Sequence, residues 1–194
     1  IAAVIVEPIA ANMNLLLPEP GFLARLRALC DRYKSVLIFD EVITGFRVAL
    51  GGAQELFCIK PDLTILGKIL GGGFPIGAFG GKSEIMDLLS PEGPVYQAGT
   101  FSGNPLVISA GLSTLKVLLG KDYAGLNKLG DFLAQNIKEV KNYGSMFSFD
   151  FKSKKEFSLF YRRMLAEGVY FAPSMYETNF LSFSHTKKAI SRTI

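Results

Sequence analysis

The chain has few of the side chains from which metal and nucleophile sites are usually built. Among its 194 residues there is one histidine, His185, and there are two separate cysteines, Cys30 and Cys58. A zinc site needs clustered Cys and His ligands, and a Ser-His-Asp triad would have to use His185, so both are disfavoured and we expect no metal. Two isolated cysteines do not form a disulfide framework, and we expect reduced thiols in the cytoplasm.

Long apolar runs and strongly basic segments are also missing. No stretch approaches the roughly 18 apolar residues that a spanning helix needs, and no basic leader precedes an apolar segment at the start. The formal net charge is +4, and only 152–155 and 187–188 approach basic clusters. A solvated surface explains these lysines better than a nucleic-acid site does. We therefore expect neither a membrane nor a nucleic acid as a partner.

Apolar side chains, in contrast, are plentiful, and hydrophobic residues make up 49% of the chain. A chain of 194 residues with this content can bury a large core and would form one domain or two small ones. An apolar excess is also expected where further segments or a partner subunit normally cover the surface.

Apolar runs and helical spacing alternate over the first 120 residues. The predicted strands lie at 2–7, 35–40, 63–66 and 75–80, and the predicted helices at 21–32, 83–89 and 104–119. We expect Leu23, Leu26 and Leu29 to face the core and Ser83 to cap the second helix. Near-continuous runs of Val, Ile and Leu between helices indicate parallel strands covered on both faces. The expected fold class is α/β with a mostly parallel sheet.

From about residue 121 the sequence becomes more polar and predicts a small α/β unit. Its predicted elements are a helix at 126–140, a strand at 145–151, a helix at 155–166 and a short strand at 169–171. We place the domain boundary near Gly120, so that 1–120 forms the first domain and 121–194 the small C-terminal one.

Lys68 and Asp40 carry the main functional signal. Asp40 ends one predicted strand, and Lys68 follows another and precedes three glycines at 71–73. Glycines let another molecule approach the backbone, so an amine beside them suits a Schiff base, and a carboxylate suits the pyridinium nitrogen of pyridoxal phosphate (PLP). A P-loop is disfavoured, because Ile69 stands where Ser or Thr is required and Asp62 where the first glycine is required.

Five ordered motifs resemble those of the class III aminotransferases. They are Val-Glu-Pro at 6–8, Phe-Asp-Glu-Val at 39–42, Thr-Gly-Phe-Arg at 44–47, Leu-Gly-Lys at 66–68 and Gly-Thr-Phe-Ser-Gly-Asn-Pro at 99–105. The resemblance implies the PLP-dependent transferase fold type I, with an incomplete large domain and a small C-terminal α/β domain. It covers about the C-terminal half of the usual enzyme, and we expect such a part to be inactive alone. The family usually has more chain near 140–143 and 152–155.

The same resemblance implies roles around the cofactor ring. Lys68 would hold PLP and, once released from it, move protons between substrate carbons. Asp40 would keep the ring nitrogen protonated, and Val42 would pack against the ring face, a role compatible with that of a plain core valine. Glu41 points the other way in an extended chain and could equally be structural, so we assign it little.

Four more residues are implicated by the resemblance. Asn12 would donate to the phenolic oxygen of the cofactor with Glu7 nearby, although Asn12 also suits a plain turn. Thr100 would reach the phosphate of the neighbouring subunit's cofactor, which implies a homodimer. Many related aminotransferases grip a substrate carboxylate with arginine near position 177, whereas Glu177 would repel it and suit an amino group. An exposed loop carboxylate is the alternative for Glu177.

Stretches at 12–13, 47–54, 94–100 and 168–170 resemble a branch of the class that moves an amino group within one molecule. The implied reaction uses the pyridoxal and pyridoxamine forms of the cofactor and converts glutamate 1-semialdehyde to 5-aminolevulinate for tetrapyrrole synthesis. The alternative is an ω-aminotransferase with a separate amino donor and a 2-oxo acid acceptor. A non-catalytic scaffold is disfavoured, because it would need none of Lys68, Asp40 and Thr100. The expected location is the cytoplasm, or the plastid for a plant protein.

Overall fold

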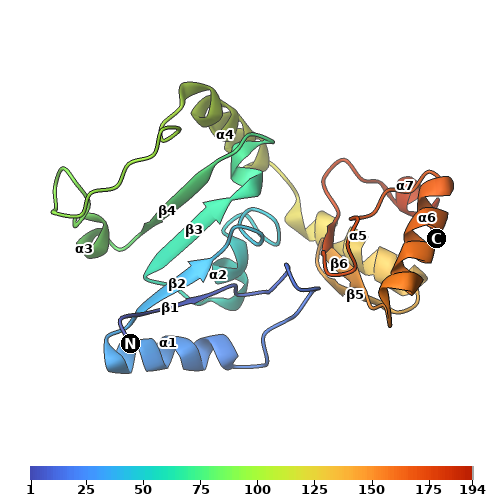
Figure 1. Ribbon diagram of the computed structural model, residues 1–194, viewed down its shortest axis with the longest axis horizontal. Helices are drawn as coiled ribbons and strands as arrows, with labels where there is room; N and C mark the ends of the chain where they lie inside the picture. The colour runs from blue at the N-terminus through green and yellow to red at the C-terminus, as the bar shows by residue number, and fades with distance from the viewer. Residues whose placement is uncertain (194) are drawn as a thin grey trace. The chain divides into compact units, whose positions relative to one another are not determined.

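The computed structural model describes residues 1–193, which form two compact units (Figure 1). The first unit contains Ile1–Pro8 and Pro18–Gly120, and the second contains Ile9–Leu17 and the chain from Lys121 onward. The segment Ile9–Leu17, expected in the first domain, folds with the second unit because its backbone is bonded there. The amide of Asn14 donates to the carbonyl of Tyr176 at 2.6 Å.

A four-stranded sheet forms the centre of the first unit, in the order β1-β2-β3-β4 (Figure 1). Its strands are β1 (Ala3–Val6), β2 (Val36–Asp40), β3 (Leu63–Gly67) and β4 (Gly77–Gly81). The first three strands are parallel, as predicted, and β4 is antiparallel to β3. Only a short connection containing the 3₁₀ turn η1 (Lys68–Gly71) separates β3 from β4, and it is too short for the crossover that a parallel pair needs.

The helices of the first unit are α1 (Phe22–Tyr33), α2 (Gly52–Phe57), α3 (Ser83–Met86) and α4 (Pro105–Leu118). Leu23 and Cys30 of α1 are buried against Leu37 and Phe39 of β2, whereas Leu29 is 49% exposed. The expectation that Leu29 faces the core is therefore wrong. Leu23 and Cys30 are two helical turns apart and share one stripe, from which Leu29 is rotated away.

The helix ends agree with the sequence in one case and differ in another. Asn104 caps α4, because its side chain accepts from the amides of Leu106 and Val107 and Pro105 occupies the first turn. The prediction that Ser83 caps α3 is wrong. Ser83 is already helical, and Lys82 stands at the cap without a side-chain hydrogen bond, because an ammonium group cannot accept from the helix amides. The amine of Lys82 is paired instead with a carboxylate elsewhere.

That carboxylate belongs to Asp62, a buried residue that ties four elements together just before β3. Asp62 accepts from the Leu37 amide of β2 at 2.6 Å, from Arg27 of α1 at 2.8 Å and from Lys82 after β4 at 2.7 Å. Burial alone would raise the pKa of Asp62. The hydrogen bonds from Lys82, Leu37 and Arg27 outweigh burial and lower this pKa to about 2.

The lowered pKa of Asp62 makes a testable link between pH and stability. Its folded pKa is about 2 against an ordinary 3.8, so the ionised form is favoured by folding. The stabilisation, roughly 2 kcal/mol, is complete above pH ~4 and is lost as the pH falls toward ~2. Asp62→Asn should lower the free energy of unfolding by about that amount at neutral pH and flatten its slope between pH ~4 and ~2.

Urea unfolding at a series of pH values measures both effects of Asp62→Asn. The exposed Asp87 of the same unit provides the control, and Asp87→Asn should leave the stability and its slope unchanged. The same slope in the Asp62→Asn variant as in the unchanged protein would contradict the assignment.

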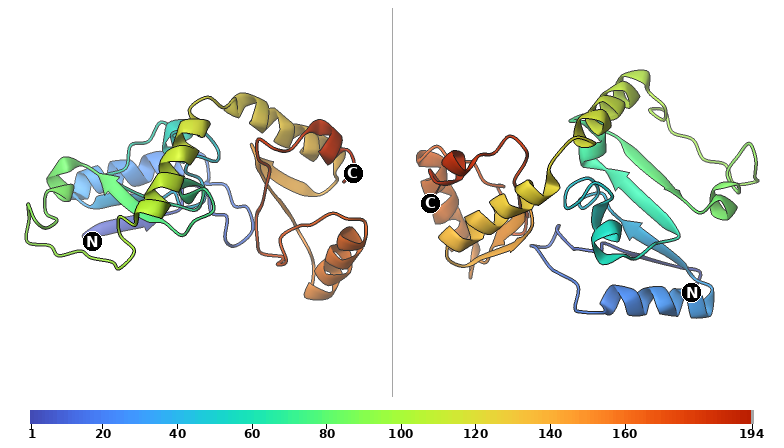
Figure 2. Two further views of the ribbon diagram at one scale, coloured as in Figure 1. Left: turned by 90° about the horizontal axis from the view of Figure 1, so that it is seen from above. Right: turned by 180° about the vertical axis from the view of Figure 1, so that it is seen from behind.

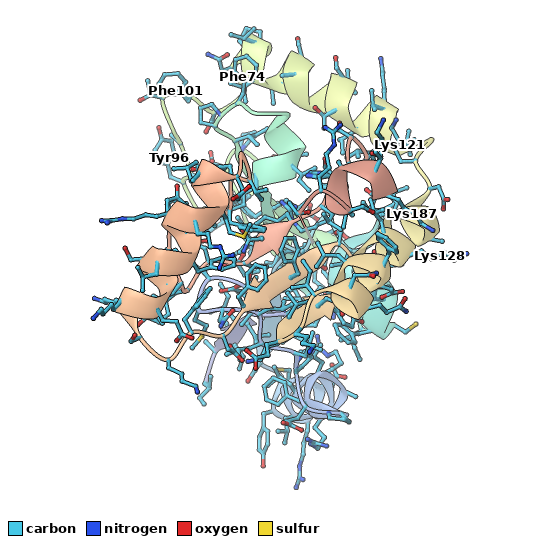
Figure 3. All side chains as sticks on the ribbon, turned by 90° about the vertical axis from the view of Figure 1, so that its right-hand side faces the viewer. Phe74, Tyr96, Phe101, Lys121, Lys128 and Lys187 are labelled. Atoms are coloured by element: carbon cyan, nitrogen blue, oxygen red, sulfur yellow. The ribbon has the colours of Figure 1, made fainter. Side chains whose placement is uncertain are left out.

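The second unit contains an antiparallel sheet in the order β5-β6-β7. Its elements are α5 (Tyr123–Asn136), β5 (Val140–Tyr143), β6 (Met146–Phe149), α6 (Lys154–Ala166), β7 (Asn179–Phe180) and α7 (Lys187–Ile190). Leu126 and Leu133 of α5 pack with Phe147, Leu181 and Ile190 in one buried cluster. Lys121 precedes α5, Lys128 lies in α5 and Lys187 lies in α7. All three side chains are exposed and are labelled in Figure 3.

Two sequence predictions for this unit need correction. The helix predicted at 126–140 ends at Asn136, because Val140 pairs with Phe149 in the sheet. The strand predicted at 169–171 is not formed, and Asn179–Phe180 takes the place beside β6. Phe171 instead packs through its ring, 5.2 Å from Phe149 and 5.6 Å from Phe160.

The hairpin of β5 and β6 is closed by two residues. Tyr143 pairs with Met146, and Gly144 adopts the left-handed φ of 55° that such a turn requires. Within residues 1–193, no helix is long and apolar enough to cross a membrane, and no group of three or more His, Cys, Asp or Glu side chains could hold a metal ion.

Candidate functional site

Asp40 and Lys68 lie at the same edge of the first unit's sheet. Asp40 ends β2 and is in register with Ile65 of the parallel strand β3, and Lys68 follows the last residue of β3 directly. Asp40 is half-buried, and its Oδ1 accepts from the Val42 amide at 3.1 Å, whereas Lys68 is exposed. The parallel pairing thus brings the predicted carboxylate and the predicted amine to one edge, with the amine free to meet another molecule.

Glu7 and Val42 lie at this edge too. Val6 of β1 is in register with Phe39 of the parallel strand β2. The next residues of the two chain segments are Glu7 and Asp40, so Glu7 lies beside Asp40. A Cβ added to Gly67 would lie 3.4 Å from Cγ1 of Val42, so Val42 packs against the backbone just before Lys68. Both the ring-face role and the core role predicted for Val42 are compatible with this position.

The backbone of Lys68 is in an uncommon conformation. Its φ is 46°, in the left-handed region. Residues with a Cβ rarely adopt this conformation, because it costs roughly 1–2 kcal/mol of conformational free energy. Helix α4 packs directly on the turn that follows. A Cβ on Gly111 would lie 2.9 Å from the carbonyl oxygen of Leu70, and a Cβ on Gly72 would collide with Oγ1 of Thr114. Close packing of α4 against η1 therefore holds the turn that carries Lys68.

This packing predicts a specific sensitivity at Gly111. Gly111→Ala should lower the free energy of unfolding of the first unit by roughly 1–3 kcal/mol, because the new methyl group must push the Leu70 carbonyl away. Gly120→Ala is the matched control after the same helix, since a Cβ there meets nothing within 4 Å. Urea unfolding compares the two variants, and equal stabilities would show that α4 does not hold the turn.

Thr100 lies in the long connection between α3 and α4. This connection has little regular structure, and in the right-hand view of Figure 2 it runs apart from the strands. Every residue from 94 to 103 is exposed. The structure therefore places Thr100 at the surface of its own unit, where its hydroxyl is open to another molecule.

Asn12 and Glu177 belong to the second unit, where both are exposed. Their segments lie side by side, because the amide of Asn14 donates to the carbonyl of Tyr176, the residue before Glu177. Asn14 Nδ2 also donates to Asp150 at 2.9 Å. The structure thus divides the predicted residues into a group at the sheet edge, the exposed Thr100, and the pair Asn12 and Glu177.

Glu41 is the residue to which we assigned little from the sequence, beyond a possible structural role. It is 1% exposed, and its carboxylate accepts four hydrogen bonds from Thr44, Ala53 and Gln54. A signal was available in the sequence, since an acid inside an apolar segment must find partners when it is buried.

The chain belongs to the class III aminotransferases, because the family model described as aminotransferase class-III matches residues 1–185. In the fold, the chain is similar to an ω-transaminase from Sphaerobacter thermophilus, with a TM-score of 0.87 and 32% identity over 98% of this chain and 49% of that one. It is also similar to a transaminase with PLP bound, with a TM-score of 0.85 and 25% identity over 98% of this chain and 49% of that one. The fold is thus that of the PLP-dependent class III transaminases, fold type I.

Among curated proteins, the chain is 50% identical to glutamate-1-semialdehyde 2,1-aminomutase of Desulfovibrio desulfuricans. The match extends over 217 residues and covers 100% of this chain and 51% of that protein, so the chain spans about half the length of this relative. Because this chain has 194 residues, it is shorter than the matched region.

Proposed function

We propose that this chain carries the cofactor lysine of an enzyme that converts glutamate 1-semialdehyde to 5-aminolevulinate by intramolecular amino transfer. The observation that carries the proposal is the placement of Asp40 and Lys68 at one sheet edge, in a chain of the class III family. The choice of the aminomutase reaction rests on the identity to the named aminomutase, which exceeds the identity to the ω-transaminase.

The residues at the edge fit PLP. Lys68 offers an exposed amine to the aldehyde, and Asp40 offers a carboxylate to the ring nitrogen. The glycines after Lys68 leave room beside it, since a Cβ on Gly73 would meet no atom within 4 Å. When bound, PLP supplies a conjugated ring that stabilises negative charge on the carbon next to the substrate nitrogen.

The chain's own residues then have distinct tasks. Asp40 keeps a proton on the ring nitrogen by placing a negative charge beside it. Lys68 holds the cofactor at rest and, when its amine is free, takes a proton from one substrate carbon and returns it to the other. Val42, which packs beside Gly67, would limit the movement of the ring on one face.

Glu177 supports the aminomutase reading over the alternative ω-aminotransferase. A carboxylate repels the carboxylate of an ordinary amino acid and attracts an amino group, so it favours a substrate bound with its amino-bearing end nearby. Asn12, on the adjacent segment, would donate to the phenolic oxygen of the cofactor.

Exposed apolar side chains support the proposal of a homodimer in which Thr100 reaches the neighbouring cofactor. Phe74, Tyr96 and Phe101, labelled in Figure 3, are 42%, 82% and 71% exposed. They flank the turn after Lys68 and the segment around Thr100. Exposed aromatic side chains of this size are typical of surfaces that another protein covers. We place the enzyme in the cytoplasm, with a small molecule as its substrate.

The reaction is tested by supplying one substrate. Enzyme containing this chain, loaded with the pyridoxamine form and given glutamate 1-semialdehyde alone, should make many equivalents of 5-aminolevulinate, because net isomerisation needs no second substrate. Product is counted per cofactor. If formation stops after one equivalent and resumes only when an amino donor or a 2-oxo acid is added, the protein is an ω-aminotransferase.

A further inference from the structure

We propose that Glu41 is a positioning residue, whose buried carboxylate locks the end of β2 to α2 and thereby holds Asp40 and Val42 at the edge that carries Lys68. The inference deepens the proposed function, on which its cofactor readout rests. Its structural part concerns only contacts within the first unit.

The carboxylate of Glu41 is bonded on both oxygens. Oε2 accepts from Oγ1 of Thr44 at 2.8 Å and from the amide of Ala53 at 2.7 Å. Oε1 accepts from the amide and from Nε2 of Gln54, at 2.9 and 3.1 Å. Ala53 and Gln54 are in the first turn of α2, whose amides have no partner within the helix. One side chain thus joins the end of β2 to the start of α2.

The backbone of Glu41 is fixed as well. Its amide donates to the carbonyl of Ile65 in β3 at 2.9 Å, and its carbonyl accepts from the amide of Gly45 at 2.8 Å. A Cβ on Gly45 would lie 2.7 Å from that carbonyl oxygen, so glycine is needed for the bond. Glu41 is therefore held at its amide, its carbonyl and its carboxylate.

The bonds continue from Glu41 to β3. Nε2 of Gln54 also donates to Oγ1 of Thr64 at 3.3 Å, which ties α2 to β3. A Cβ on Gly52, whose φ is 75°, would collide with the Glu41 carboxylate, so the backbone is shaped around the acid. The two strands that carry Asp40 and Lys68 are thus joined through one buried carboxylate.

This arrangement fixes the neighbours of Glu41 more than it stabilises α2. Helix α2 has only six residues, and burying a carboxylate is costly even when it is fully bonded. Asp40 is the last residue of the extended strand β2, so its side chain points away from that of Glu41, and Val42 begins the turn that follows. Anchoring Glu41 on one side therefore directs Asp40 to the other, where its carboxylate accepts from the Val42 amide and holds the start of the turn.

Amide hydrogen exchange tests the positioning without any cofactor. In the PLP-free protein, Glu41→Gln should raise the exchange rate of the Val42 amide about tenfold relative to the amides of Leu37 and Phe39. A Val42 rate that is unchanged, or that rises only in step with those of Leu37 and Phe39, would overturn the proposal.

Two further variants sharpen the test. Glu55→Gln is the matched control, because Glu55 also accepts an amide of the α2 region, that of Gly51 at 2.6 Å, but is exposed and does not contact β2. It should leave Val42 exchange unchanged. Thr44→Val removes one donor and keeps the acid, and it should raise Val42 exchange less than Glu41→Gln does. If the Glu41→Gln variant does not fold, Thr44→Val tests the positioning role by itself. Unchanged exchange of the Val42 amide in Thr44→Val would then overturn the proposal.

The second readout is the visible absorbance of PLP bound to the enzyme, followed against pH. If Asp40 is displaced, the ring nitrogen loses its proton, and the nitrogen joined to Lys68 then protonates more easily because a nearby positive charge is gone. Glu41→Gln should therefore raise the pH at the midpoint of the absorbance change by about one unit, and Glu55→Gln should leave that midpoint unchanged. An unshifted midpoint in Glu41→Gln would contradict positioning. If the unchanged enzyme shows no bound PLP, the proposed function fails, while hydrogen exchange still decides the role of Glu41.

Discussion

The parallel pairing of β2 with β3 is the interaction on which the rest of the site depends. It places Asp40 beside Ile65 and so brings the end of one strand next to the start of the Lys68 turn. A slip of one residue would turn every side chain of β2 to the opposite face and would exchange the directions of Asp40 and Glu41. The register therefore decides which acid faces the proposed cofactor and which is buried.

Two buried carboxylates fix this register from opposite ends of the strands. Asp62, before β3, accepts from the Leu37 amide near the start of β2, and Glu41, after β2, accepts from the first turn of α2. Each is surrounded by donors, so a slip would leave a buried charge without partners, which is far more costly than an exposed mismatch. Hydrophobic packing of Phe39 and Leu37 sets which face is inside, and these acids set the position along the strand.

The sequence was most informative where one local cause dominates. Continuous apolar runs gave the strands that carry Asp40 and Lys68, and Asn104 with Pro105 marked the start of α4. Errors arose where distant partners decide. Val140 reads as the end of a helix until Phe149 is known to lie opposite it, and Phe171 reads as part of a strand although it lies outside the sheet and packs with its ring on Phe149. The left-handed backbone of Lys68 depends on α4, and it could not be predicted from neighbouring residues. An acid in an apolar segment signals that Glu41 must have partners, but which residues of α2 supply them could not be predicted.

The central claim is that Lys68 is the amine that holds the cofactor. Borohydride reduction of the PLP-loaded enzyme, followed by proteolysis and peptide mass analysis, locates the attachment directly, because reduction makes the link permanent. The account predicts the added pyridoxyl mass on the peptide that contains Lys68 and on no other. The mass on a different lysine, or on none although PLP is bound, would contradict it.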